Sequence, residues 1–181
     1  LDVETVAFDD AVEIYEALAK GERRSLAAIF EYDGAVEIER TKTQPGAARA
    51  PKSGDVGVAF VGAGNYAKAV LLPQLKSMKG LAHRAVVTST GPSAQRVSER
   101  FSFAQCGTDL DAALSADGVD LVFITTQHHL HADQAIAALS AGKSVWLEKP
   151  IALSVDDVDR VAEAARSADG VFAVGYNRRF S

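Results

Sequence analysis

The chain has 181 residues, of which 48% are hydrophobic and 24% charged, and its net charge at pH 7 is -5. This composition is typical of a globular protein, and the acidic balance argues against binding to nucleic acid or to an anionic membrane surface. No apolar run approaches the roughly 18 residues of a membrane span. A single cysteine excludes an internal disulfide framework and suits a reducing compartment, so we expect a cytoplasmic protein.

Residues 1–55 differ in pattern from the rest of the chain. An amphipathic helix follows Asp10, and Gly21 lies just beyond its end, where a left-handed residue commonly stops a helix. The apolar run over residues 26–32 predicts a short strand. No periodic apolar face continues over residues 33–55, which are rich in Pro, Gly, Ala and Lys, so we interpret that segment as a linker.

From residue 56 onward, apolar runs alternate with amphipathic segments. Strands are predicted at residues 56–61, 85–88, 103–106, 120–125, 144–147 and 171–174. Helices are predicted at residues 66–79, around 97–101, and at 110–114, 131–141 and 154–168; Pro73 is expected to kink or shorten the first of them. Strands that are apolar on both faces and alternate with helices indicate a parallel sheet with right-handed crossovers. We therefore predict an α/β, doubly wound Rossmann sheet with an N-terminal helix-strand appendage and a linker.

The turn after the strand at residues 56–61 carries a glycine motif, Gly62-Ala63-Gly64-Asn65-Tyr66-Ala67. In a dinucleotide fingerprint Gly62 makes the tight turn, Gly64 lets the backbone approach a pyrophosphate, and Ala67 lets the helix pack closely on the sheet. The helix amino end then offers N–H groups and a positive dipole to the phosphates. The alternative is a tight turn that binds no ligand.

The position expected to contact the adenosine ribose lies about 20 residues further on. Ser89 stands there between Thr88 and Thr90, and no carboxylate occurs between Ala85 and Arg96. Small hydroxyl groups with an arginine nearby suit a 2′-phosphate, so NADP is at least as compatible as NAD. Equally, these residues could be an ordinary loop.

Three histidines, at positions 128, 129 and 131, follow the strand at residues 120–125. A zinc site is one interpretation, but no cysteine or carboxylate completes a familiar ligand spacing, so we predict no metal. We favour a loop that lies beneath a nicotinamide, made of Thr125, Thr126, Gln127 and His128. His131 is then expected to pack or hydrogen-bond at the start of the following helix.

Lys149 is the strongest candidate for chemistry. The strand at residues 144–147 ends at Glu148-Lys149-Pro150, and open α/β sheets bind their ligands at the carboxyl ends of their strands. The lysine would therefore face the reactive end of a bound dinucleotide.

Four segments together resemble the glucose-fructose oxidoreductase and inositol dehydrogenase family, Gfo/Idh/MocA: residues 62–67, 122–131, 138–150 and 174–180. The resemblance implies a Rossmann domain over residues 56–176 and a C-terminal α/β domain that residues 177–181 would begin. It also implies NAD or NADP as the cofactor, a sugar- or polyol-like substrate and a homo-oligomeric full-length protein. Lys149 would serve in catalysis and contact the substrate, and Arg178 would also contact the substrate. Glu148 would orient the cofactor or the lysine, and Pro150 would follow a cis bond.

Two departures from the family pattern limit this transfer. The acidic ribose contact is missing, and the aspartate and histidine that the family's second domain contributes have no counterpart in these 181 residues. We therefore expect the isolated chain to be inactive.

Residues 1–32 resemble the last helix and strand of a medium-chain zinc alcohol dehydrogenase, mainly over residues 8–18. That resemblance implies that the tail of a dehydrogenase-like module precedes the Rossmann domain.

The leading hypothesis is the dinucleotide-binding domain of an NAD(P)-dependent oxidoreductase. A non-catalytic module that senses a nucleotide and a methyltransferase that uses the same glycine loop are the alternatives. The predicted cofactor contacts are Gly62, Gly64, Asn65, Tyr66, Ala67, Ser89, Thr90, Thr125, Thr126, Gln127, His128, Glu148 and Lys149.

Overall fold

The computed structural model describes residues 3–23, 27–32, 40–43 and 53–176. The chain divides into two compact units, Leu1–Glu39 and Arg40–Ser181. In the first unit, strands β1 (Val3–Ala7) and β2 (Ala27–Glu31) pair in parallel on either side of helix α1 (Ala11–Ala19) in the chain. The predicted helix and strand are confirmed, and Gly21 adopts a φ of +72° just after the helix. Strand β1 was not predicted.

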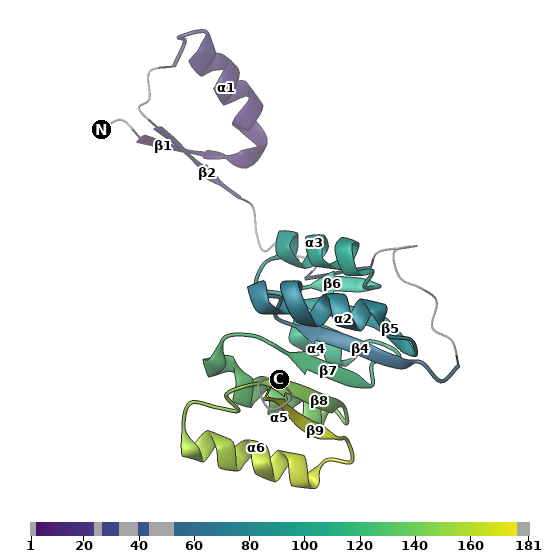
Figure 1. Cartoon of the computed structure of the whole chain (residues 1–181). Helices are drawn as coiled ribbons and strands as arrows, with labels where there is room; N and C mark the ends of the chain where they lie inside the picture. The colour runs from purple at the N-terminus through teal and green to yellow at the C-terminus, as the bar shows by residue number, and fades with distance from the viewer. Residues whose placement is uncertain (1–2, 24–26, 33–39, 44–52, 177–181) are drawn as a thin grey trace. The chain divides into compact units, whose positions relative to one another are not determined.

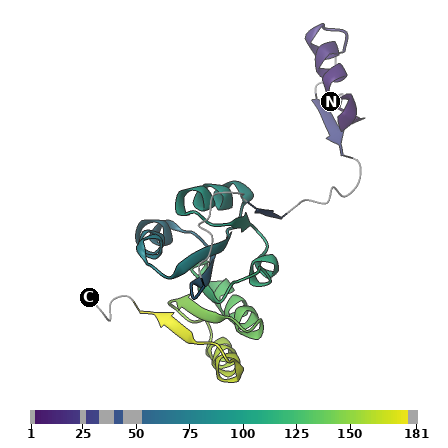
Figure 2. The same cartoon turned by 90° about the vertical axis from the view of Figure 1, so that its right-hand side faces the viewer.

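The second unit is built on one seven-stranded sheet with the order β3-β6-β5-β4-β7-β8-β9 (Figure 1). Every neighbouring pair is parallel except β3 with β6. Strand β9, yellow in Figures 1 and 2, forms the edge opposite β3. The strands are β3 (Thr41–Thr43), β4 (Val56–Val61), β5 (Leu81–Val87), β6 (Gln105–Gly107), β7 (Leu121–Ile124), β8 (Ser144–Glu148) and β9 (Phe172–Gly175). The doubly wound α/β prediction is confirmed.

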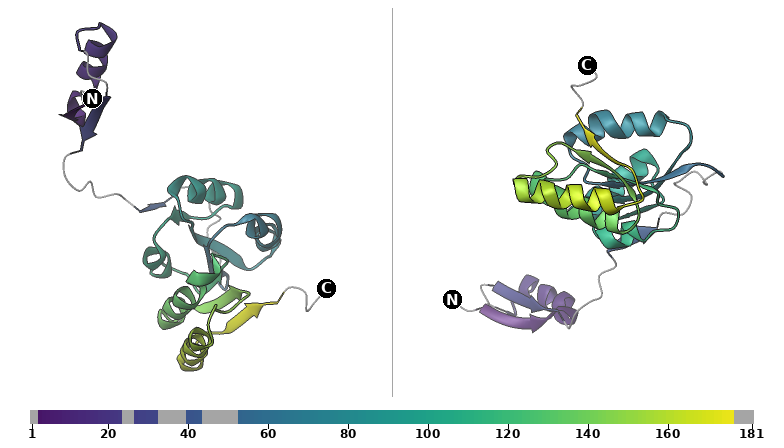
Figure 3. Two further views of the ribbon diagram at one scale, coloured as in Figure 1. Left: turned by 90° about the vertical axis from the view of Figure 1, so that its left-hand side faces the viewer. Right: turned by 90° about the horizontal axis from the view of Figure 1, so that it is seen from below.

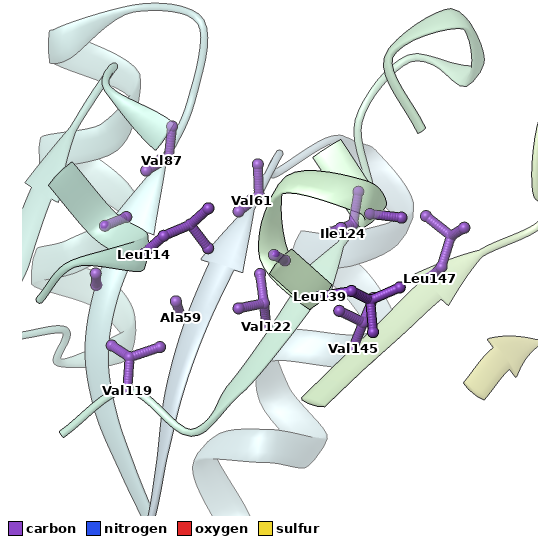
Figure 4. Packing of buried hydrophobic residues seen from close by; sticks show 14 of the residues in the cluster. Ala59, Val61, Val87, Leu114, Val119, Val122, Ile124, Leu139, Val145 and Leu147 are labelled. Carbon is purple, nitrogen blue, oxygen red and sulfur yellow. The ribbon is translucent and has the colours of Figure 1, made fainter. Parts of the chain in front are cut away.

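Helices cover both faces of this sheet, and the core has two halves. On one face α4 (Leu110–Leu114), α5 (His131–Ser140) and α6 (Val155–Ser167) pack on alternate residues of the central strands, such as Val122 and Leu147 (Figure 4). On the other face α2 (Leu72–Ser77) and α3 (Gly91–Phe101) pack around Phe60. The right-hand view of Figure 3 shows α6 and α2 on opposite sides of the sheet. Burial of both faces explains why the strands read as continuous apolar runs.

The helix after the glycine turn differs from its predicted form. It begins at Asn65, runs as a π-helix over Ala67–Leu71, and continues as α2 to Ser77, two residues short of the predicted end. Leu72 donates its N–H to the Ala67 carbonyl, five residues back. Pro73 is the second residue of α2, directly after the π-helical turn, and has no N–H to donate. The helix continues through the proline, with a changed hydrogen-bond register in the preceding turn.

Part of the predicted linker is a strand. β3 pairs antiparallel with β6, from Thr41 opposite Gly107 to Thr43 opposite Gln105, and extends the sheet by one strand. A three-residue polar strand has no periodic signal of its own, because its pairing depends on the exposed edge of β6. The remainder of the predicted linker lies outside the described residues, apart from Arg40 and residues 53–55.

Ser154 caps the helix that was predicted at residues 154–168. The Ser154 hydroxyl oxygen accepts the Asp157 N–H at 3.1 Å and begins α6. Within the described ranges, none of the helices is long and apolar enough to cross a membrane.

Candidate functional site

The turn at Gly62 is held by contacts on both sides. Its φ is +83°, and a Cβ added to it would lie 2.8 Å from the Thr125 carbonyl and the Thr126 methyl group. The Gly62 N–H donates to the Val87 carbonyl at 2.8 Å, and the Thr125 hydroxyl donates to the Gly62 carbonyl at 2.8 Å. Only glycine fits this position, because both the left-handed conformation and the close approach of β7 exclude a side chain.

Gly64 is different, because it faces open space. No atom lies within 4 Å of an added Cβ, and the residue is exposed. Its carbonyl accepts the Lys68 N–H at 3.0 Å as the helix starts. The helix begins at Asn65, beside Gly64, and the amino end of a helix is a favourable position for an anion. Ala67, only 2% exposed, packs the same turn against the core, as predicted from the motif.

A cavity of about 530 Å³ opens beside this turn, at the carboxyl ends of β4, β5 and β7. Six of the predicted contacts line it: Gly62, Gly64, Thr125, Thr126 and Gln127 come from the glycine turn and the loop after β7, and Ser89 follows β5. Among its described lining residues there is no Asp or Glu. The acidic ribose contact that the sequence lacks has therefore not been supplied from elsewhere in the described chain.

A second cavity, of about 380 Å³, adjoins the first. Gly64, Thr125 and Thr126 line both cavities and thus form their common wall. The second cavity adds the predicted residues Asn65, Tyr66, Ala67, His128, Glu148 and Lys149. Two linked cavities, one under the glycine turn and one ending at a lysine, suit an elongated ligand with an anionic middle.

Glu148 and Lys149 have opposite environments. Glu148 is 7% exposed, and its Oε2 accepts the Lys149 backbone N–H at 3.0 Å. Its Oε1 is buried and has no hydrogen-bond partner among the described residues. The Lys149 side chain is exposed and lines the cavity. The Lys149-Pro150 bond is cis, as the family resemblance implied.

One predicted contact among the described residues lines neither cavity. This residue is Thr90, and its carbonyl instead accepts the Thr88 hydroxyl at 2.9 Å and the Ala94 N–H at 3.0 Å at the start of α3. Arg178 lies outside the described residues. The prediction missed Thr88, Ser93, Thr108, Leu110, Leu130, His131 and Gln134. The position of Ser93 in the first turn of α3 was a usable signal, whereas Thr108 and Gln134 reach the cavity only through tertiary packing.

The histidines do not form a metal centre. Among the described residues no group of three or more His, Cys, Asp or Glu side chains is arranged to hold a metal ion. His131 is fully buried, and both of its ring nitrogens face carbonyl oxygens, those of Pro150 at 2.7 Å and Thr126 at 3.2 Å. His128 lies edge-on to it with ring centroids 5.5 Å apart. The expected hydrogen bonding of His131 is confirmed.

Known proteins share this fold. Residues 56–176 match the sequence profile of the Gfo/Idh/MocA family, described as an oxidoreductase family with an NAD-binding Rossmann fold. A 3-ketoreductase from Actinomadura kijaniata, solved in complex with TDP-benzene and NADP, superposes with a TM-score of 0.63 at 27% identity, covering 67% of this chain and 38% of that one.

Two curated relatives cover the same region. 4-Carboxy-2-hydroxymuconate-6-semialdehyde dehydrogenase of Sphingobium is 35% identical over 124 residues, which are 68% of this chain and 39% of the relative. Inositol 2-dehydrogenase of Salmonella typhimurium is 29% identical over 131 residues, 71% of this chain and 38% of the relative. The chain thus spans less than half the length of the curated relatives that it matches.

Proposed function

This chain belongs to the Gfo/Idh/MocA family of oxidoreductases with an NAD-binding Rossmann fold, and from that premise we propose the function of the protein of which it forms part. That protein is an NAD(P)-dependent oxidoreductase that moves a hydride to or from a sugar- or polyol-like substrate. The present chain supplies the dinucleotide-binding domain and one side of the active site. The observation that carries the proposal is the pair of adjoining cavities that share the Gly64 wall and end at Lys149.

The residues present fit a nicotinamide dinucleotide. Gly64 leaves room where a pyrophosphate must approach the helix amino end, and the larger cavity takes the adenosine half. The smaller cavity takes the nicotinamide half, between Thr126 and Glu148. Glu148 lines the smaller cavity, where its carboxylate is an acceptor suited to a ribose hydroxyl or a carboxamide N–H. The cofactor, when bound, supplies the hydride-carrying carbon.

The chain's own residues handle the proton. Lys149 reaches the smaller cavity from the end of β8, where its amine can take the proton of a reacting hydroxyl or return it to a carbonyl. The Glu148 carboxylate accepts the Lys149 backbone N–H and so holds the start of this turn. Thr125 and Thr126 separate the lysine's cavity from the adenosine cavity and limit how deep the ligand can slide.

Calorimetric titration of the 181-residue chain tests the proposal. We expect NADP and NAD to bind with one site per chain and S-adenosylmethionine not to bind. Absence of binding by either nicotinamide cofactor to a chain with an intact circular dichroism spectrum would reject the function. Binding of S-adenosylmethionine alone would favour a methyltransferase.

We expect NADP to bind more tightly than NAD. Ser89 and Ser93 line the larger cavity, and Arg96 lies on the same face of α3 as Ser93, three residues along. Hydroxyl and guanidinium groups suit a 2′-phosphate, whereas a carboxylate would repel it. The complex of the A. kijaniata 3-ketoreductase with NADP supports this choice.

The Ser89→Asp variant should reverse that preference. A carboxylate at this position should weaken NADP binding at least about tenfold through charge repulsion and strengthen NAD binding by accepting the ribose 2′-hydroxyl. The measurement is the ratio of the two dissociation constants by calorimetry. Ser167→Asp, which adds the same charge at the far end of α6, is the control and should leave the ratio unchanged. An unchanged ratio in Ser89→Asp would exclude Ser89 from the ribose contact.

The same proposal covers the regions on either side of the Rossmann domain. Because the relatives are more than twice as long as the matched region, a C-terminal α/β domain beginning near residue 177 would complete the substrate site and the homo-oligomer contact. Residues 1–32 would be the tail of a zinc-dehydrogenase-like module, consistent with a separate compact unit at Leu1–Glu39. We place the full protein in the cytoplasm.

A further inference from the structure

His131 bridges two loops of the candidate site. It is the first residue of α5 and is completely buried. Its Nδ1 lies 2.7 Å from the Pro150 carbonyl oxygen, and its Nε2 lies 3.2 Å from the Thr126 carbonyl oxygen. Carbonyl oxygens only accept, so each contact is a hydrogen bond when the ring nitrogen that makes it carries a proton.

The two carbonyls belong to two different loops at the smaller cavity, since Thr126 lines it directly and Pro150 follows the lining residue Lys149. Thr126 follows β7 and separates the two cavities, and Pro150 follows Lys149 at the end of β8. The paired residues of β7 and β8 end at Ile124 with Leu147. Beyond that pair the two loops no longer share a strand ladder, and the His131 ring spans them.

The loop after β7 is also tied to α5 by a second contact. The Thr126 hydroxyl donates to Gln134 Oε1 at 2.6 Å, one turn along the helix from His131. The turn that carries Lys149, in contrast, reaches α5 through the Pro150 carbonyl. The bond from His131 to Pro150 is therefore the link that sets the lysine turn relative to the Thr126 loop.

We propose that His131 is a positioning residue for both loops of the site, and this proposal rests on the proposed function. Through Nδ1 it holds the turn that presents Lys149, and through Nε2 it holds the loop on which the nicotinamide half of the cofactor lies. If the buried histidine only filled space, loss of the contact at one ring nitrogen would have the same effect as loss of the contact at the other.

Two amide variants separate the two contacts. Asparagine places a donor near the position of Nδ1, and glutamine places one near Nε2. His131→Asn should therefore retain the bond to Pro150 and lose the bond to Thr126, and His131→Gln should do the reverse. His129→Asn and His129→Gln, made at an exposed neighbour that lines neither cavity, are the matched controls.

Two readouts are measured on the 181-residue chain. NADP affinity, by calorimetry, reports the Thr126 loop. The acetylation rate of Lys149 relative to exposed Lys79, by mass spectrometry after brief treatment with acetic anhydride, reports the lysine turn without any cofactor.

We expect the readouts to split. His131→Asn should weaken NADP binding about three- to tenfold, the equivalent of one lost hydrogen bond, and leave the acetylation ratio within about twofold of wild type. His131→Gln should shift the acetylation ratio about three- to tenfold and leave the NADP affinity within about twofold. Variants that move both readouts together, or neither, would overturn the positioning role.

The outcomes also separate this inference from the proposed function. If the wild-type chain binds no NADP, the proposed function fails, and the acetylation ratio alone decides the contact with Pro150. Thermal unfolding by circular dichroism accompanies each variant. If one variant unfolds, the other decides, and unfolding of both would assign His131 to the core and overturn the inference.

Discussion

Replacing Lys149 with alanine in the full-length protein should lower kcat/KM about a hundred- to ten-thousand-fold, the range associated with loss of a general acid-base group. The loss should fall on turnover, because the lysine stands at the end of the smaller cavity and the glycine turn lies between the two cavities. Affinity for NADP should change by no more than about threefold, since one exposed side chain at the rim contributes little to binding.

Lys149→Arg distinguishes proton transfer from simple charge attraction. An arginine retains the positive charge but does not release a proton near neutral pH, so this variant should be nearly as inactive as the alanine variant. Lys79→Ala, at an exposed lysine that lines neither cavity, is the control. Normal turnover in Lys149→Ala would exclude the lysine from catalysis, and full activity in Lys149→Arg would limit its role to electrostatics.

Substitution of the two glycines in the glycine turn, Gly62 and Gly64, should separate the effect on cofactor affinity from the effect on stability. In the 181-residue chain Gly64→Ala should abolish measurable NADP binding, because the methyl group would stand where the pyrophosphate approaches the backbone. Its unfolding temperature should stay close to wild type, because an added Cβ at this position meets no atom within 4 Å.

Gly62→Ala should lose both properties. The left-handed conformation costs about 1–2 kcal/mol for a residue with a side chain. The added Cβ also lies 2.8 Å from the Thr125 carbonyl, so the loop after β7 has to move. Gly142→Ala is the matched control, because Gly142 has a φ of +72° with open space around it and tests the conformational cost alone.

Unfolding by denaturant, monitored by circular dichroism, compares the three variants, and calorimetry gives their NADP affinities. A Gly64→Ala variant that binds NADP normally would contradict the assignment of this turn to a phosphate. Equal destabilisation in Gly62→Ala and Gly142→Ala would show that the contact with Thr125 costs nothing.

The central strands and the glycine turn were predictable because their signal is local. Residues 57–61 are buried on both faces, so an unbroken apolar run identifies the strand without knowledge of its neighbours. At β5 the prediction began four residues late, because His83 and Arg84 interrupt the apolar run. Their side chains bond to the carbonyls of Phe101 and Asp117, which lie far along the chain. A polar residue satisfied by a distant partner cannot be recognised as part of a strand from the sequence.

The site residues also divide into those with a local signal in the sequence and those placed by the tertiary structure. Gly62, Gly64 and Lys149 were identified from the turn chemistry and the end of a strand, and each lines a cavity in the structure. Thr90 was expected beside Ser89, yet its carbonyl accepts hydrogen bonds at the start of α3 and the residue stays outside both cavities. Adjacent residues in a loop point in different directions, and only the course of the backbone decides which of them faces the ligand.

The sequence by itself determined the doubly wound sheet, the glycine turn and the lysine at the end of β8, because periodicity, glycine conformation and strand ends are local properties. Tertiary structure alone decided that β3 extends the sheet, that the buried carboxylate of Glu148 keeps one unpartnered oxygen, and that His131 spans Thr126 and Pro150. Each of these depends on partners brought together by packing, across 5 to 19 residues for His131 and across the exposed edge of β6 for β3. No spacing rule encodes such contacts, because the chain between the partners sets only how far apart they can be.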